Sequence, residues 1–298
     1  MKIIECPRDA MQGIDEFIPT DIKVKYINSL LKVGYDTIDV GSFVSPKAIP
    51  QMRDTAEVLK KIDMTCRATT HVSSQHDEGT TTRRSSLLAI IANLRGAQDA
   101  VQFDEVNYLG FPFSISETFQ KRNANSTIAE SLVRVEEIQN LCIQHRKELV
   151  VYLSMAFGNP YGDEWSSDIA IHWSHKLHDM GIKIIALSDT IGVSNPENIT
   201  TLFSALIPEL KDVEFGAHLH TTPDKWEEKV NAAYNSGCRR FDAAIKGFGG
   251  CPMASDKLTG NMPTENLLSY FRNKQIPLSI DMDAFAQSML IAGEVFPH

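Results

Sequence analysis

The sequence lacks several features that would assign it to a compartment or a class of partner. It has no apolar run of about 18 residues, so no membrane-spanning helix is expected. Its first residues, MKIIECPRDA, contain no apolar signal core and no Arg- and Ser-rich transit pattern, so we expect a cytoplasmic protein. The five cysteines are odd in number and widely spread, which favours reduced thiols over a disulfide framework. The net charge of −9 gives no reason to expect binding to nucleic acid or to an anionic membrane.

What the 298 residues do contain is an alternation of short β-rich runs with longer helical patterns. Several runs are almost continuously apolar, as is typical of parallel strands covered on their outer face. No G-x-G-x-x-G motif follows the first run, which weakens the case for an open dinucleotide-binding sheet. We therefore predict an α/β fold, a single-domain (β/α)₈ TIM barrel over residues 1–298. The predicted strands are 2–6, 37–41, 87–92, 105–110, 149–157, 184–189, 214–220 and 240–246.

Amphipathic helices are predicted between these strands at 21–33, 126–143, 166–180 and 223–236. For the helix at 126–143, Ser126 or Thr127 is the expected N-cap.

One stretch does not fit the alternation of strands and helices. Residues 69–86 are polar and almost free of apolar side chains, and we predict an exposed loop insertion there.

Functional groups of parallel barrels gather at the carboxyl ends of the strands, and polar residues are frequent at these positions here. The clearest signal is His218 and His220, because alternate residues of a strand face the same side. Two imidazoles and one carboxylate form a common shell for a divalent metal, and Asp9 at the end of the first strand can supply the carboxylate. Two histidines held by hydrogen bonds at the barrel top are the simpler alternative.

Other polar residues at these ends are ambiguous when taken one by one. Arg8 can stabilise an enolate oxygen or belong to an ion pair. Asp39 can orient a neighbour or carry a proton. Cys251 lies in GFGGCP, where Gly249 and Gly250 give the loop backbone freedom, so its thiol can act as an acid or base; a small apolar residue in a turn is the alternative.

Six motifs together resemble the hydroxymethylglutaryl-CoA lyase family, within a wider group of metal-dependent barrel lyases and Claisen-type synthases. They span nearly the whole chain: PRDAMQG at 7–13, SFVSPKAIPQM at 42–52, SDTIGV at 188–193, HLH at 218–220, GFGGCP at 247–252 and GNMPTE at 260–265. The second motif and the cysteine of the GGCP sequence point to the lyase branch. The family's PRDGLQ reads PRDAMQ here, its usual glutamate is Asp39, and Thr221 replaces the usual acidic residue after H-x-H.

The resemblance implies a divalent cofactor, Mg²⁺ or Mn²⁺, held by Asp9, His218, His220 and Asn261. It implies catalytic roles for Arg8, Asp39, His220 and Cys251. The supporting residues would be Gln12, Ser42, Asp189 and Glu265, with Gly249 and Gly250 in the loop.

The reaction implied is cleavage of 3-hydroxy-3-methylglutaryl-CoA, or a close 3-hydroxyacyl-CoA, to acetyl-CoA and acetoacetate. Two alternatives stay open at this point. One is a 4-hydroxy-2-keto-acid aldolase or Claisen-type acyl-CoA synthase on the same metal site, and the other is a non-catalytic metal-binding barrel. The expected partner is a small acyl-CoA substrate, and the oligomeric state is open, with a homodimer as one option.

Overall fold

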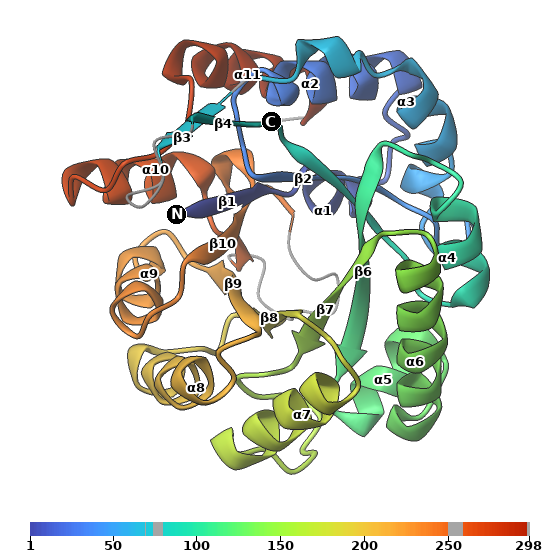
Figure 1. Cartoon of the computed structure of the whole chain (residues 1–298), viewed down its shortest axis with the longest axis vertical. Helices are drawn as coiled ribbons and strands as arrows, with labels where there is room; N and C mark the ends of the chain where they lie inside the picture. The colour runs from blue at the N-terminus through green and yellow to red at the C-terminus, as the bar shows by residue number, and fades with distance from the viewer. Residues whose placement is uncertain (69, 74–79, 250–258, 297–298) are drawn as a thin grey trace.

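Eight parallel strands close into a ring, as predicted (Figure 1). The computed structural model describes residues 1–68, 70–73, 80–249 and 259–296. Within them the parallel strands follow the order β1-β2-β5-β6-β7-β8-β9-β10, and β10 pairs with β1 to close the barrel. The sheet strands are β1 Lys2–Glu5, β2 Thr37–Ser42, β5 Ser86–Ile90, β6 Val106–Ser114, β7 Glu148–Ser154, β8 Ile184–Asp189, β9 Glu214–Thr221 and β10 Arg240–Ala243.

The strands are apolar because both of their faces are covered. Every residue of β2 and β8 is buried, and the outward side chains pack beneath an outer layer of helices (Figure 1). The helices are α1 Pro7–Gln12, α2 Thr20–Leu31, α3 Thr55–Lys61, α4 Leu94–Ala100, α5 Glu117–Ala124, α6 Ile128–Gln144, α7 Ser167–Asp179, α8 Pro196–Glu209, α9 Trp226–Asn235, α10 Thr264–Asn273 and α11 Met282–Val295.

The four predicted helices are confirmed as α2, α6, α7 and α9, with shifts of up to three residues at their ends. In α6, the Thr127 side chain accepts from the backbone N–H of Glu130, and the Glu130 carboxylate accepts from that of Thr127. This reciprocal capping fixes the start of the helix at the predicted N-cap.

Two predictions about local structure were wrong. Residues 69–86 are not simply a loop, because β3 Thr70–Ser73 and β4 Thr80–Arg83 pair antiparallel in a separate two-stranded sheet. The threonines of this polar stretch favour extended backbone, a preference that a search for apolar residues misses. The eighth barrel strand ends at Ala243 rather than at 246, because Ile245–Gly247 forms a 3₁₀ turn that leads into the glycine-rich loop.

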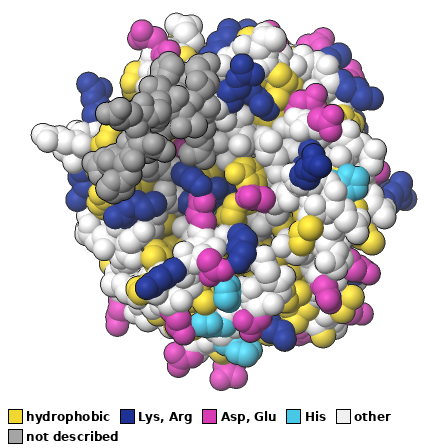
Figure 2. Space-filling model, viewed as in Figure 1, with side chains coloured by type: hydrophobic (Ala, Val, Ile, Leu, Met, Phe, Trp, Pro, Cys, Tyr) yellow, Lys and Arg dark blue, Asp and Glu magenta, His cyan; other side chains and the backbone are white. Residues whose placement is uncertain are grey.

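One face of the molecule carries charges of both signs. On the face drawn in Figure 2, basic and acidic side chains are interspersed, and neither sign forms a continuous field. None of the helices in the described parts of the chain is long and apolar enough to cross a membrane.

Candidate active site at the carboxyl end of the barrel

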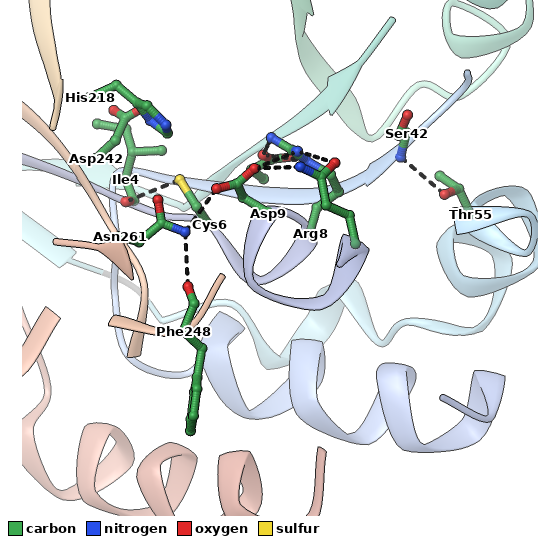
Figure 3. A network of polar contacts seen from close by, with 12 residues as sticks. Ile4, Cys6, Arg8, Asp9, Ser42, Thr55, His218, Asp242, Phe248 and Asn261 are labelled. Carbon is green, nitrogen blue, oxygen red and sulfur yellow. Dashed lines mark hydrogen bonds and ion pairs between the residues drawn. The ribbon is translucent and has the colours of Figure 1, made fainter. Parts of the chain in front are cut away.

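The segment PRDAMQ leaves β1 and folds at once into the short helix α1, which sequence reasoning did not predict. Pro7 occupies the first helical position, where a missing N–H costs nothing, and Asp9 lies in the first turn, where negative charge is favourable. Arg8 and Asp9 are each 7 % exposed. The helix therefore fixes both side chains at the rim of the barrel interior (Figure 3).

The Arg8 guanidinium joins two carboxylates. Its Nε and Nη2 donate to Asp39 Oδ2 at 2.9 and 2.6 Å, and its Nη1 donates to Asp9 Oδ1 and Gln12 Oε1, both at 2.8 Å. Burial opposes the charge on Arg8, but the two aspartates outweigh it and raise the Arg8 pKa. Five N–H groups are available on a guanidinium, and these four contacts leave one Nη2–H for a ligand.

The two aspartates differ in their electrostatic surroundings. Burial alone would raise the pKa of Asp9, but attraction to Arg8, His218 and His220 lowers it to about 2. For Asp39, which is fully buried, burial outweighs the attraction of Arg8 and raises the pKa to about 6. Asp39 Oδ1 has no partner among the described residues. Asp9 is therefore a permanent anion, while Asp39 titrates closer to neutral pH.

His218 and His220 face the same side of β9, as their spacing predicts. One ring nitrogen of each and one Asp9 oxygen lie within 4.8 Å of one another. His218 Nδ1 lies 3.1 Å from Asp242 Oδ2, a contact that favours the proton on Nδ1 and leaves the Nε2 lone pair available. Burial, and then the neighbouring His218, lower the pKa of His220 to about 4, so this ring is neutral at pH 7.

Asn261 completes this cluster from the other side of the glycine-rich loop. β11 Gly260–Asn261 pairs antiparallel with β9, which sets Asn261 opposite His220. Asn261 Nδ2 donates to Asp9 Oδ2 at 2.8 Å and to the Phe248 carbonyl at 2.9 Å (Figure 3). Its amide oxygen is thus the atom left for a further ligand. The donor set of one carboxylate, two imidazoles and one amide oxygen suits a divalent cation.

The loop starts in direct contact with this cluster. Gly249 has φ +86°, and a Cβ there would lie 2.8 Å from both Ala10 Cα and Asp9 O. Only glycine fits this position, both for its backbone angle and for its close approach. Gly250 and Cys251 lie outside the described residues.

A cavity of about 610 Å³ opens over these groups. Arg8, Asp9, His218 and His220 line its floor, together with Gln12 and Ser42. Arg122 and Arg134 also line it and bring positive charge to the cavity. The cavity therefore offers a polar reaction centre and space for a ligand with negative groups.

The remaining expected supporters lie farther out. Asp189 pairs with Lys229 Nζ at 2.8 Å, and the same Lys229 nitrogen donates to the His220 carbonyl at 2.8 Å. Glu265 accepts from the Lys246 backbone N–H at 2.9 Å, at the start of α10. Neither carboxylate contacts Asp9 or a histidine ring through a hydrogen bond in the described residues, so both act on the loops and backbone around the cluster.

Sequence reasoning missed Asp242 and Lys229 in this region, as well as the cavity residues Arg122 and Arg134. Asp242 was visible as an acidic residue inside an otherwise apolar run, FDAAI, and it is only 3 % exposed. Lys229 lies in the amphipathic helix α9, where a lysine ordinarily faces solvent. Nothing in the local pattern indicated that its ammonium group reaches Asp189.

The chain matches the HMGL-like family over residues 2–289. It is 31% identical over 283 residues to the cytoplasmic 3-hydroxy-3-methylglutaryl-CoA lyase of Rattus norvegicus, covering 95% of this chain and 77% of that protein. It is 30% identical over 277 residues to the hydroxymethylglutaryl-CoA lyase of Bacillus subtilis, covering 93% and 86%.

Solved structures agree with this match. An HMG-CoA lyase from Acinetobacter baumannii, in complex with coenzyme A and 3-methylmalate, superposes with a TM-score of 0.85 at 32% identity, covering 99% of this chain and 90% of that chain. The barrel, the motifs and the relatives all lead to one assignment: the chain belongs to the HMGL-like family of lyases and aldolases.

Proposed function

We propose that this protein is a divalent-metal-dependent carbon–carbon lyase that cleaves 3-hydroxy-3-methylglutaryl-CoA to acetyl-CoA and acetoacetate. The observation that carries the proposal is the convergence of Asp9, His218 and His220 beside the Arg8 donor on one cavity floor. Relatives at about 30% identity that are HMG-CoA lyases support the choice of substrate.

Asp9, His218 and His220 would hold Mg²⁺ or Mn²⁺, with the Asn261 amide oxygen as a weaker fourth ligand. Such a cation supplies positive charge that polarises substrate oxygens and lowers the pKa of a hydroxyl group. Asp9 suits this role because its pKa of about 2 keeps the carboxylate ionised at neutral pH. His220 suits it because its ring is neutral and therefore has a lone pair to give.

Removal of the substrate hydroxyl proton needs a nearby acceptor. Asp39 Oδ1 and His220 Nδ1 are both buried without a partner among the described residues. His220 lines the cavity, but a neutral imidazole that gives its one lone pair to a cation cannot also take a proton. We therefore assign the proton to Asp39 Oδ1, because burial raises the pKa of Asp39 to about 6 while its Oδ2 holds the Arg8 guanidinium in place.

The spare Nη2–H of Arg8 would stabilise the enolate oxygen that develops as the C2–C3 bond breaks. Because Asp39 and Asp9 hold the guanidinium from two sides, this donor needs no reorganisation when charge develops. The Cys251 thiol, on the loop that follows Gly249, would then protonate the enolate carbon. Arg122 and Arg134 would attract the anionic groups of the CoA moiety, in keeping with the CoA-bound relative.

The test is a metal-supplemented assay that follows acetoacetate and acetyl-CoA from 3-hydroxy-3-methylglutaryl-CoA, with 4-hydroxy-2-keto acids in parallel. We expect thioester cleavage that needs Mg²⁺ or Mn²⁺ and is severely slowed in Cys251→Ser. The control Cys66→Ser changes a half-buried thiol near Asp63 and should be neutral. Cleavage of keto acids alone would establish an aldolase, and metal binding without any turnover would establish a non-catalytic barrel.

A further inference from the structure

A second set of metal-ligating side chains lies directly beside the first and shares one residue with it. Cys6, His218 and Asp242 each offer a ligand atom, and these atoms lie within 4.8 Å of one another. They come from three neighbouring strands, because Cys6 follows β1, His218 lies on β9 and Asp242 on β10 (Figure 3). His218 is therefore a member of both sets.

The contacts within this second set are incomplete. Cys6 is 2 % exposed, and among the described residues its Sγ donates only to the Ile4 carbonyl, over a long distance of 3.8 Å. Asp242 Oδ1 is buried and has no partner among the described residues. A buried carboxylate oxygen without a partner is costly, and a bound ligand would satisfy it.

The donor types differ from those of the first set. One sulfur, one imidazole nitrogen and one carboxylate oxygen are the ligands preferred by Zn²⁺ and by softer dications, whereas Mg²⁺ prefers oxygen. The path to these atoms runs through the cavity, since the His218 side chain lines it and is 14% exposed. A thiophilic cation can thus approach the second set from the cavity, past the shared imidazole.

We propose that Cys6, His218 and Asp242 form a second cation site, specific for thiophilic dications such as Zn²⁺ or Cd²⁺, whose occupation excludes the metal from the Asp9 site. The competition between the two sites rests on the metal site that we propose for the lyase reaction. Binding of a cation by Cys6 does not depend on that proposal. The second site acts as an inhibitory site built into the barrel floor.

The exclusion follows from the single lone pair of a neutral imidazole. With the proton on Nδ1, as the Asp242 contact favours, Nε2 is free for the Asp9 site. A cation at the second site takes the Nδ1 lone pair, so the ring proton moves to Nε2, and the Cys6 thiol releases its proton to solvent. Nε2–H then has no lone pair to give, and two dications so close together would also repel each other.

The test is cadmium binding to the full chain in a Cys66→Ser/Cys251→Ser background, which removes one half-buried thiol and the loop thiol. We expect ultraviolet thiolate-to-cadmium absorption from one site per chain. Bound Cd²⁺ should weaken Mn²⁺ binding, measured from the electron paramagnetic resonance of free Mn²⁺, by at least about fivefold. Adding Cys6→Ser should abolish both effects, with Cys6→Ala as the second variant if the serine destabilises the fold.

A matched control is Cys238→Ser, because Cys238 is equally buried but donates to the Arg240 carbonyl at 3.1 Å, away from His218. It should keep both effects. Thiolate-to-cadmium absorption that survives in Cys6→Ser would overturn the proposed site. If Cd²⁺ weakened Mn²⁺ binding as much in Cys6→Ser as in the background protein, cadmium would bind at the Asp9 site instead. Asp9 belongs to the first site only, so the thiolate-to-cadmium absorption should persist in Asp9→Asn. The second site can therefore be tested even if the proposed lyase activity is not found.

Discussion

Two buried charge clusters lie at the same end of the barrel, and they differ in how completely their atoms are paired. In the Asp189 cluster, Oδ2 accepts from Lys229 Nζ at 2.8 Å and from the Ser194 hydroxyl at 2.5 Å, while Oδ1 accepts from the Val193 N–H at 2.8 Å. Lys229 donates further to the carbonyls of Gly192 and His220. Both groups of the ion pair are therefore saturated.

The cluster around Asp9 is more strongly charged and less complete. Arg8 holds two aspartates, yet Asp39 Oδ1 and His220 Nδ1 have no partner in the described part of the chain. A cavity borders this cluster. The contrast separates two uses of buried charge: the saturated cluster fixes loops against β8 and β9, and the unsaturated one keeps atoms available for a ligand.

The largest effect is expected from Asp9→Ala, which should abolish turnover and lower metal affinity by more than about 100-fold, since changes beyond the direct ligands already cost up to that much. Folding should be retained. Isothermal titration with Mn²⁺ and a circular dichroism spectrum measure the two properties. Unchanged metal stoichiometry would show that the Asp9 cluster is structural like the Asp189 cluster.

The next largest effect is expected in the saturated cluster. Lys229→Met leaves Asp189 buried without a counter-ion, which should lower the free energy of unfolding by about 3–5 kcal/mol. Urea denaturation measures the loss. The control Lys25→Met removes a partly exposed pair with Glu294 and should cost no more than about 1 kcal/mol. Equal stabilities of the two variants would contradict the structural role.

Arg8→Lys tests whether the unsaturated cluster is built for the reaction. A flexible ammonium cannot hold Asp39 and Asp9 while presenting a further donor, so kcat should fall about 100-fold, a loss typical of one preorganised donor. Mn²⁺ affinity and the circular dichroism spectrum should stay close to those of the unmodified protein. A near-normal kcat would make Arg8 an ion-pair partner only.

Glu5 extends the comparison to a buried carboxyl whose hydrogen-bond partners are neutral. It accepts from the Ile245 N–H and the Thr264 hydroxyl, and burial raises its pKa from 4.5 to about 8. Between these two values the folded state keeps a proton that the unfolded chain has lost, so stability falls as pH rises.

This is the smallest of the four predicted effects. The free energy of unfolding should fall by at most about 1.4 kcal/mol for each pH unit between 4.5 and 8. In Glu5→Gln the amide oxygen can accept from the Ile245 N–H and the NH₂ group can donate to the Thr264 hydroxyl oxygen, so both contacts are kept. This variant should lack the slope, so the difference in unfolding free energy between the two proteins should change across that window. Urea denaturation at several pH values measures it, and parallel profiles would show that Glu5 is ionised when folded.

Much of the fold follows from local sequence. The eight strands were predicted because apolar runs separated by amphipathic helices can be buried only as a parallel sheet covered on its outer face. The glycine at 249 and the H-x-H spacing were likewise informative, since backbone angle and strand period are local properties. The local pattern does not predict the pairing of β3 with β4, because the sequences THVS and TTTR contain a single strongly apolar residue between them.

The sequence by itself determined the barrel, the end at which its polar residues gather, and the pairing of His218 with His220 on one face. Only the tertiary structure decided what each of these residues does. It set Asp242 behind His218, sent the Lys229 ammonium to Asp189, and placed Cys6 beside the shared imidazole. The physical reason is distance along the chain: propensity and periodicity act over a few residues, whereas these contacts join residues separated by 24, 40 and more than 200 positions.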